Sequence, residues 1–277
     1  MRLRRWLKRH VPIALRGPIR YGHVRGSIVL HSLSERWFPP RSVGLPLPPP
    51  GLRYRVGSIG RQDFLDIGRN CARDLKNHIQ SLGKEIGSFN RVLDFGCGSG
   101  RVLRHFCDLP ETCRLYGSDI DPEAIAWCRS HLLRGHFAVN GPLPPLAFES
   151  ESFDLIYALS VFTHLNEDYQ RAWLAELARV AKRGGVVMLT TNGTYTQGLN
   201  FQEGLLSSKE MQDLRSNGFL FKVVETGRLK SDGLPDFYQI AFHTSDYVTR
   251  VWANYFTVRH YAERGMDGYQ DLVVLSK

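Results

Sequence analysis

The stretch Val92-Leu-Asp-Phe-Gly-Cys-Gly-Ser-Gly100 decides the fold of this chain. It opens as a short apolar run, which is typical of a buried strand, and it closes on three glycines with the spacing GxGxG. Because glycine has no β-carbon, such a loop can turn sharply out of a strand and let a ligand approach the backbone. The stretch therefore predicts a ligand-binding loop at the end of a core strand.

Two carboxylates indicate which kind of ligand this loop suits. Asp94 directly precedes the glycines, where an anion disfavours a phosphate and favours an amino group. Asp119 lies roughly 20 residues beyond the loop, at the end of the next apolar run, where a carboxylate can accept both hydroxyls of a ribose. The dinucleotide spacing GxGxxG would require glycine at the position of Arg101. The pattern favours a ligand with a ribose and a cationic group over a dinucleotide.

Segments on both sides of the loop alternate between apolar strands and amphipathic helices. Strands are expected over 91–95, 115–118, 137–139, 153–159 and 186–191. Helices are expected over 64–82, 101–107, 122–133 and 167–180. This rhythm predicts an α/β fold with a mostly parallel sheet that carries helices on both faces.

The C-terminal part of the chain departs from this rhythm. Residues 256–261 and 272–275 have the pattern of two strands, and the glycine-bearing turn Glu263-Arg-Gly-Met-Asp-Gly268 joins them, which predicts an antiparallel hairpin that closes the sheet. A helix over 207–216 and a strand over 219–225 precede it. These two elements are either an insertion or the sheet's own sixth unit, and the short hairpin turn favours the insertion.

Four segments, in this order and at this spacing, resemble the motifs of class I S-adenosylmethionine-dependent methyltransferases of the small-molecule type. They are the glycine stretch 92–100, Gly117-Ser-Asp-Ile-Asp-Pro122, Phe153-Asp-Leu-Ile-Tyr-Ala-Leu-Ser160 and Leu177-Ala-Arg-Val-Ala-Lys-Arg-Gly-Gly185. The resemblance covers about 91–191. It implies a Rossmann-like sheet of seven strands in the order 3-2-1-4-5-7-6 with the last strand antiparallel, and an insertion after the fifth strand.

The resemblance implies S-adenosylmethionine as the cofactor and no metal ion. It assigns the methionine moiety to Asp94, Phe95, Gly96, Cys97, Gly98 and Gly100, the ribose and adenine to Asp119 and Ile120, and the methyl side to Leu159 and Ser160. Asn140 would flank the adenine, at a position where many members of the family carry an acid. The helix over 64–82 is expected to lie over the cofactor.

Acceptor residues are expected after the fourth strand and in the region 192–261. His164 can serve as a base, which is needed only for a hydroxyl or a protonated amine, or it can be a structural residue of its turn. Candidates for contact with the acceptor are Tyr238, His243, Tyr247 and His260, and His243 is also a candidate catalytic residue. Residues 191–243 are expected to form a cap on the acceptor side. The acceptor is expected to be a small or glycan-like molecule that is methylated on oxygen or nitrogen.

The fourth strand also excludes some kinds of methyltransferase. Leu159-Ser-Val-Phe162 follows it, where modifiers of nucleic-acid amines have Asp/Asn-Pro-Pro-aromatic, so no nucleic-acid partner is expected. No acid ends this strand, which argues against a magnesium-dependent mechanism. Two other readings stay open, a protein that binds the cofactor without catalysis and an NAD(P)-dependent oxidoreductase.

The charge of this chain is concentrated at its N-terminus. The 277 residues have a net charge of +9, and eight cations precede the first acid, Glu35, which leaves the rest near neutral. Residues 1–50 are therefore expected to be a basic arm and a proline-rich linker, 39–50, in front of a domain over 51–277. Three alternatives stay open for the arm: a solvated or partly ordered segment, weak contact with an anionic membrane, or an organelle transit peptide. Five cysteines without a CxxC pair favour a reduced, cytoplasmic setting.

Overall fold

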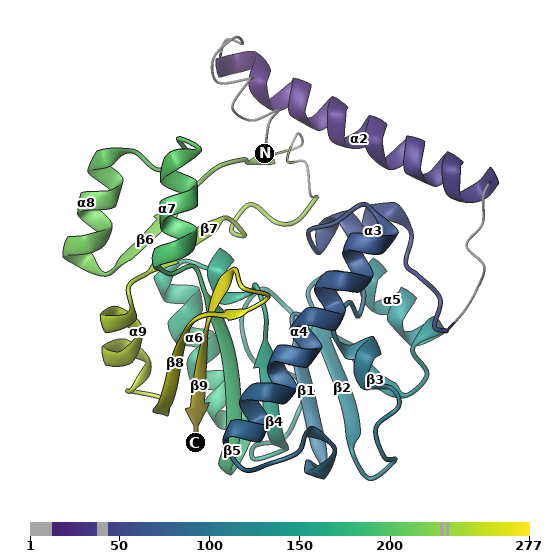
Figure 1. Ribbon diagram of the computed structural model, residues 1–277, viewed down its shortest axis with the longest axis vertical. Helices are drawn as coiled ribbons and strands as arrows, with labels where there is room; N and C mark the ends of the chain where they lie inside the picture. The colour runs from purple at the N-terminus through teal and green to yellow at the C-terminus, as the bar shows by residue number, and fades with distance from the viewer. Residues whose placement is uncertain (1–12, 38–43, 228–229, 231–232) are drawn as a thin grey trace.

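A seven-stranded sheet forms the centre of the molecule in the computed structural model, which describes residues 13–37, 44–227, 230 and 233–277. The strand order is β3-β2-β1-β4-β5-β9-β8, and β9 runs antiparallel to both of its neighbours (Figure 1). The strands are β1 Arg91–Phe95, β2 Arg114–Asp119, β3 Gly135–Val139, β4 Phe153–Ala158, β5 Ala181–Thr191, β8 Thr257–Met266 and β9 Gln270–Ser276. When only the strands of this sheet are numbered, in chain order, β8 and β9 become the sixth and seventh strands and the order is 3-2-1-4-5-7-6. The predicted Rossmann-like fold is confirmed.

Helices cover both faces of this sheet. The helices of the described residues are α2 Ile13–Trp37, α3 Pro50–Arg55, α4 Arg61–Ser81, α5 Pro122–His131, α6 Glu167–Val180, α7 Thr194–Gln202, α8 Ser208–Asn217 and α9 Ser245–Trp252, with short 3-10 turns at η1 Ile86–Ser88, η2 Leu103–Phe106 and η3 Phe162–His164. The helices α4 and α5 pack on one face, and α6 and α9 pack on the other. In the part of the chain described, no helix is long and apolar enough to cross a membrane.

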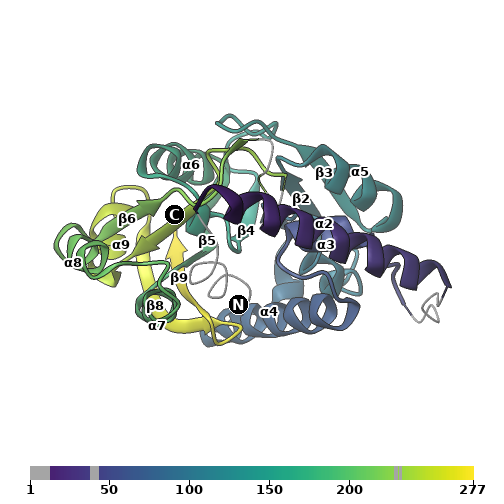
Figure 2. The ribbon, with the colours of Figure 1, turned by 90° about the horizontal axis from the view of Figure 1, so that it is seen from above.

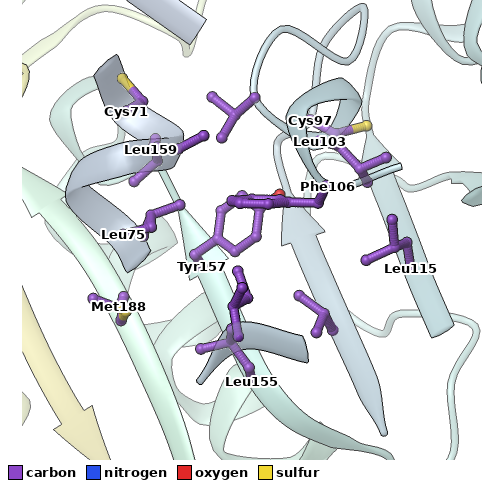
Figure 3. Close-up of a cluster of buried hydrophobic side chains, with 14 of the residues drawn as sticks. Cys71, Leu75, Cys97, Leu103, Phe106, Leu115, Leu155, Tyr157, Leu159 and Met188 are labelled. Carbon is purple, nitrogen blue, oxygen red and sulfur yellow. The ribbon is translucent and has the colours of Figure 1, made fainter. Parts of the chain in front are cut away.

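The alternation of side chains along the strands builds the two cores. In β4, Leu155 and Tyr157 join Leu75 of α4 in one cluster, which Figure 3 shows. Ile156 lies on the opposite face, with Leu177 of α6. The central strand β4 therefore buries both of its faces, as a parallel sheet between two helical layers requires.

The strands β6 (Phe219–Lys222) and β7 (Ile240–His243) form a separate two-stranded sheet. With α7 and α8 they leave the main sheet after β5, and the chain returns through α9 to β8 and β9. The insertion alternative is therefore the observed one, and we call residues 192–243 the cap.

Two expectations need correction. The helix expected over 101–107 is only the 3-10 turn η2, and Pro110, which lacks an N–H to continue a helix, lies four residues beyond it. The N-terminal arm is helical from Ile13 to Trp37, because α2 packs on α3 and Glu35 pairs with the fully buried Arg53. Of the predicted linker, residues 39–43 lie outside the described residues, and 46–49 have no regular structure.

The helix α4 approaches the end of the glycine loop so closely at Gly68 that a larger residue there should destabilise the protein. A β-carbon at Gly68 would lie 2.3 Å from the carbonyl oxygen of Arg101, so Gly68→Ala must push α4 away and should destabilise the protein by about 1–3 kcal/mol. The matched control is Gly198→Ala in α7, where a β-carbon meets nothing within 4 Å and should stabilise by roughly 0.5–1 kcal/mol. Thermal and urea unfolding measure both variants, and equal effects at the two positions would contradict this packing.

Candidate functional site

A cavity of about 470 Å³ opens at the carboxyl ends of the parallel strands, where open α/β sheets bind ligands. The glycine loop and the end of β2 form one wall, and α3, η3, the cap and the β8–β9 turn form the others. The predicted residues that line it are Asp94, Phe95, Gly96, Cys97, Gly98, Asp119, Ile120, Asn140, Leu159, Ser160, His164 and Tyr238. The sheet thus brings together residues from distant parts of the chain.

Only glycine fits at the tip of the loop. Gly96 and Gly98 have φ values of +78° and +52°, in the left-handed region that other residues rarely adopt. A β-carbon at Gly98 would lie 2.3 Å from Val56, and one at Gly96 would lie 2.2 Å from Val161. Gly100 lies outside the cavity lining, and its missing β-carbon makes room for Leu132 after α5.

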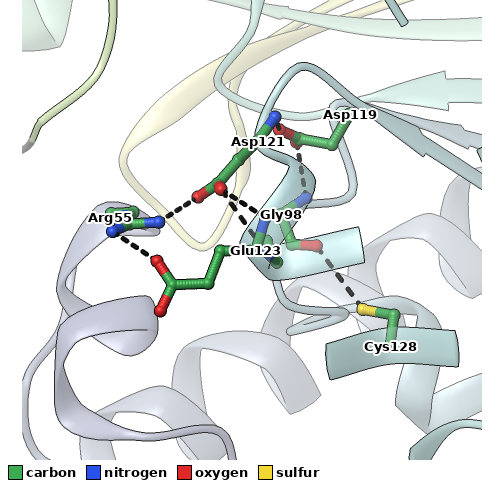
Figure 4. Close-up of polar contacts among 7 residues, drawn as sticks. Arg55, Gly98, Asp119, Asp121, Glu123 and Cys128 are labelled. Atoms are coloured by element: carbon green, nitrogen blue, oxygen red, sulfur yellow. Dashed lines mark hydrogen bonds and ion pairs between the residues drawn. The ribbon is translucent and has the colours of Figure 1, made fainter. Parts of the chain in front are cut away.

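Asp119 joins the end of β2 to the loop (Figure 4). Its Oδ2 accepts the Gly98 N–H at 2.7 Å, and its Oδ1 accepts the Asp121 N–H at 2.8 Å. Burial raises the pKa of Asp119, while these backbone donors act in the opposite direction. A carboxylate oxygen can accept more than one hydrogen bond, so Asp119 can also receive hydroxyl groups from the cavity.

The neighbouring Asp121 closes the same end of the cavity. It caps α5 by accepting the N–H groups of Glu123 and Ala124, and Arg55 bonds its other oxygen at 2.7 Å. Arg55 also pairs with Glu123, so α3 is tied across the cavity to α5. No local pattern in the sequence indicates this tie, because Arg55 and Asp121 are 66 residues apart.

Asp94 and Arg101 form the electrostatic centre of the cavity. Burial raises the pKa of Asp94 to about 8, against the opposing effects of the Tyr157 hydroxyl and the Arg101 charge. Arg101 donates to the carbonyl of Val56, and its Nε has no hydrogen-bond partner among the described atoms. Sequence reasoning used Arg101 only to exclude a dinucleotide, and the structure adds it to the lining.

Ser160 is fixed on the side of the cavity that adjoins the cap. Its φ is +60°, and its N–H donates to Thr190 while its hydroxyl donates to Gln270. The Tyr238 hydroxyl donates to the Ser160 carbonyl at 2.8 Å. Asn140 accepts a hydrogen bond from Ser118 at 2.7 Å, which holds its amide at the end of β3.

His164 is the last residue of η3 and contacts Gln239 and Tyr238 of the cap. Its Nδ1 bonds the Gln239 carbonyl, and its ring stacks on Tyr238 with centroids 4.3 Å apart. A carbonyl only accepts, so Nδ1 carries the proton and Nε2 has a lone pair. Burial lowers the pKa of His164 to about 4, which keeps the ring neutral at physiological pH.

Three predicted acceptor residues do not reach the cavity, which is a correction. His243 is fully buried between Gln170 and Trp252, and burial lowers its pKa to about 3. Tyr247 is buried on α9 and donates to Glu167 at 2.6 Å. His260 is exposed on β8. In this structure His243 and Tyr247 are core residues, and His260 is a surface residue.

Residues 92–185 match the sequence family described as "Methyltransferase domain". They form a methyltransferase domain. Several features of the cavity fit S-adenosylmethionine, the cofactor that the resemblance of the sequence motifs implies. Asp94 can face a cationic group, the Asp119 oxygens can accept ribose hydroxyls, and the glycine tip leaves room that any β-carbon would fill.

Two relatives of the methyltransferase domain share part of the chain. A phthiotriol/phenolphthiotriol dimycocerosates methyltransferase from Mycobacterium ulcerans is 29% identical over 52% of this chain and 49% of its own length. A ubiquinone biosynthesis O-methyltransferase from Bradyrhizobium sp. is 26% identical over 57% of this chain and 58% of its own length. The chain thus spans about half the length of the relatives it matches.

A solved structure shares the fold of the methyltransferase domain. Magnesium protoporphyrin IX methyltransferase from Synechocystis PCC 6803, with bound S-adenosylhomocysteine, is 16% identical and has a TM-score of 0.51. The match covers 81% of this chain and 93% of that one. At this identity, the likeness concerns the fold alone.

The raised pKa of Asp94 predicts that cofactor binding depends on pH. Asp94 is protonated below about pH 8 without ligand, and a bound ammonium group favours its charged form, so binding releases a proton. Affinity for S-adenosylhomocysteine should therefore rise between pH 6 and 7.5 by up to about tenfold per pH unit. Calorimetry in buffers with different ionisation enthalpies measures the released proton, and Asp94→Asn should remove this dependence. The same slope in Asp94→Asn would assign the proton to another group.

Proposed function

We propose that this protein transfers a methyl group from S-adenosylmethionine to a hydroxyl group of a small acceptor with an apolar part. The observation that carries the proposal is the continuity of one cavity, whose lining runs from Asp94 and Asp119 past Ser160 to His164. A cofactor at the glycine loop and an acceptor at the cap would therefore meet without crossing a protein wall.

When bound, the cofactor supplies an activated methyl group. The chain then mainly has to hold the acceptor in line with that group, an effect that can be worth up to ~7–11 kcal/mol. Ser160 and Leu159 line the cavity and would border the place where the two ligands meet. The tether from Tyr238 to the Ser160 carbonyl supports a fixed geometry there.

His164 suits the role of general base in this proposal. Nε2 would accept the proton of the acceptor hydroxyl as its oxygen is methylated, so that the imidazole becomes an imidazolium. The Gln239 carbonyl orients the ring through Nδ1. A hydroxyl needs such a base more than a neutral amine does, which favours O-methylation.

The acceptor wall supports an apolar component in the substrate. Leu165, Leu234 and Phe237 line the cavity beside Tyr238 and His164. Relatives are named for ubiquinone biosynthesis and for phthiotriol dimycocerosates, whose names denote apolar molecules. A glycan-like acceptor is the second candidate, because Arg55, Asp121 and Gln270 add polar groups to the same cavity.

We place the protein in the cytoplasm, and all five cysteines are free, which suits a reducing compartment. An apolar acceptor would also give the basic N-terminal arm a role, namely contact with the membrane in which such molecules dissolve. A protein that binds the cofactor without catalysis would show no turnover, which distinguishes this alternative from the proposed enzyme.

Replacing His164 tests the proposed chemistry. His164→Ala should lower the release of S-adenosylhomocysteine by roughly 10²–10⁴-fold at pH 7 with a hydroxyl acceptor, because the base is lost. The deficit should shrink toward pH 4, where the wild-type ring becomes protonated and loses its function as a base. His260→Ala, an exposed histidine outside the cavity, is the matched control and should retain full activity.

Cofactor affinity distinguishes a chemical from a structural effect of these variants. Calorimetry with S-adenosylhomocysteine should give values within about twofold of wild type, a difference below ~0.5 kcal/mol. Full activity in His164→Ala would contradict its role as base. Binding without turnover across hydroxyl, amine and glycan acceptors would favour the non-catalytic alternative.

A further inference from the structure

The helix α2 presents an apolar face to solvent. Val24 is buried against the body, whereas five large apolar side chains of the same helix are exposed: Ile19 by 41%, Val29 by 55%, Leu30 by 68%, Leu33 by 49% and Trp37 by 76%. At about 100° per residue, these five lie between about 120° and 180° around the helix axis from Val24. They therefore form one stripe on the side opposite the body, which we call the outer stripe.

The composition of α2 is unfavourable for a helix in water. Gly17, Pro18, Gly22 and Gly26 are the residue types with the lowest helix propensity. A β-carbon at any of these three glycines would meet nothing within 4 Å, so packing against the body does not require glycine there. A second surface that covers the outer stripe would stabilise this helix.

Charge identifies the kind of surface. Residues 1–37 contain nine arginines and lysines and a single acid, Glu35. Glu35 is already paired with Arg53 and Arg61, so it does not offset the cations. Arg25 and Arg36 are exposed beside the outer stripe. An apolar stripe flanked by cations matches the acyl boundary and the headgroups of an anionic lipid surface.

The position of α2 relates this surface to the cavity. Figures 1 and 2 show α2 crossing above the carboxyl ends of the parallel strands, the edge at which the cavity opens. Arg20 pairs with Glu225 of the cap, and Glu35 pairs with Arg53 of α3. The helix is thus held at both ends with its outer stripe directed away from the strands.

We propose that α2 lies flat on an anionic lipid surface, with the outer stripe in the acyl boundary and Arg25 and Arg36 at the headgroups. The edge of the sheet that holds the cavity then faces the bilayer, so an acceptor dissolved in the membrane has a short route to His164. Only this last step rests on the proposed function. Lipid binding by α2 stands without it.

Vesicle flotation of the full chain tests this contact. The probes are phosphatidylcholine vesicles with and without phosphatidylglycerol. The triple variant Leu30→Ser, Leu33→Ser, Trp37→Ser removes most of the outer stripe and keeps every charge. The matched control is Leu133→Ser, Phe201→Ser, Val223→Ser, which replaces three exposed apolar residues on other elements.

Wild type and the control should float with the anionic vesicles only, and the α2 variant should bind on the order of tenfold more weakly. Arg25→Gln with Arg36→Gln should also weaken binding, and salt should reduce it. Equal flotation of the α2 variant and the control would overturn the proposal. So would wild-type binding to neutral vesicles alone, or a wild-type dimer that the α2 variant converts to monomer without any vesicle binding.

Affinity for S-adenosylhomocysteine, measured on the same proteins, separates the two proposals. It should be unchanged in both triple variants, because neither touches the cavity lining. If the wild type does not bind S-adenosylhomocysteine, the proposed function is refuted, and the flotation result still stands.

Discussion

The hydrogen bond from the Gly98 N–H to the Asp119 carboxylate, 2.7 Å long, is the contact on which the site depends. It joins the loop after β1 to the end of β2, two parallel strands whose carboxyl ends meet at one edge of the sheet. The same carboxylate also accepts the Asp121 N–H, and Asp121 in turn caps α5 and binds Arg55. Two acids, Asp119 and Asp121, therefore set the positions of the loop, α5 and α3 around the cavity.

Burial of charge is the second constraint, and it opposes stability. Asp94 and Arg101 are both shielded from solvent, burial raises the pKa of the acid, and it lowers the pKa of the guanidinium. Burial therefore disfavours the charged form of each group. A zwitterionic ligand would supply an opposite charge to each of them, and we infer that its charges complete the site.

Local patterns in the sequence predicted the sheet and the glycine loop, whereas long-range contacts escaped prediction. Residues 91–191 carry alternating strands and helices, so their pattern predicted the sheet, and the resemblance to the methyltransferase motifs assigned candidate binding residues to the strand ends. His243 shows where this reasoning ends. His243 lies in β7 and pairs with Phe219 of β6, and a shift of this register by one residue would turn its side chain to the other face of the small sheet. His164 stacks on Tyr238, which lies 74 positions further along the chain, and only the tertiary fold brings the two together. The helix α2 contains several glycines, which disfavour a helix, so it also depends on tertiary contacts.

The central claim is that the glycine loop and Asp119 hold S-adenosylmethionine or its product. Titration calorimetry of S-adenosylhomocysteine into the full-length protein and into Asp119→Ala tests it most directly. The account predicts binding at one site per chain, and a loss of about 1.5–3 kcal/mol, roughly 10- to 100-fold in affinity, when the acceptors for the ribose hydroxyls are removed. Tight binding of NAD together with no binding of S-adenosylhomocysteine would contradict it.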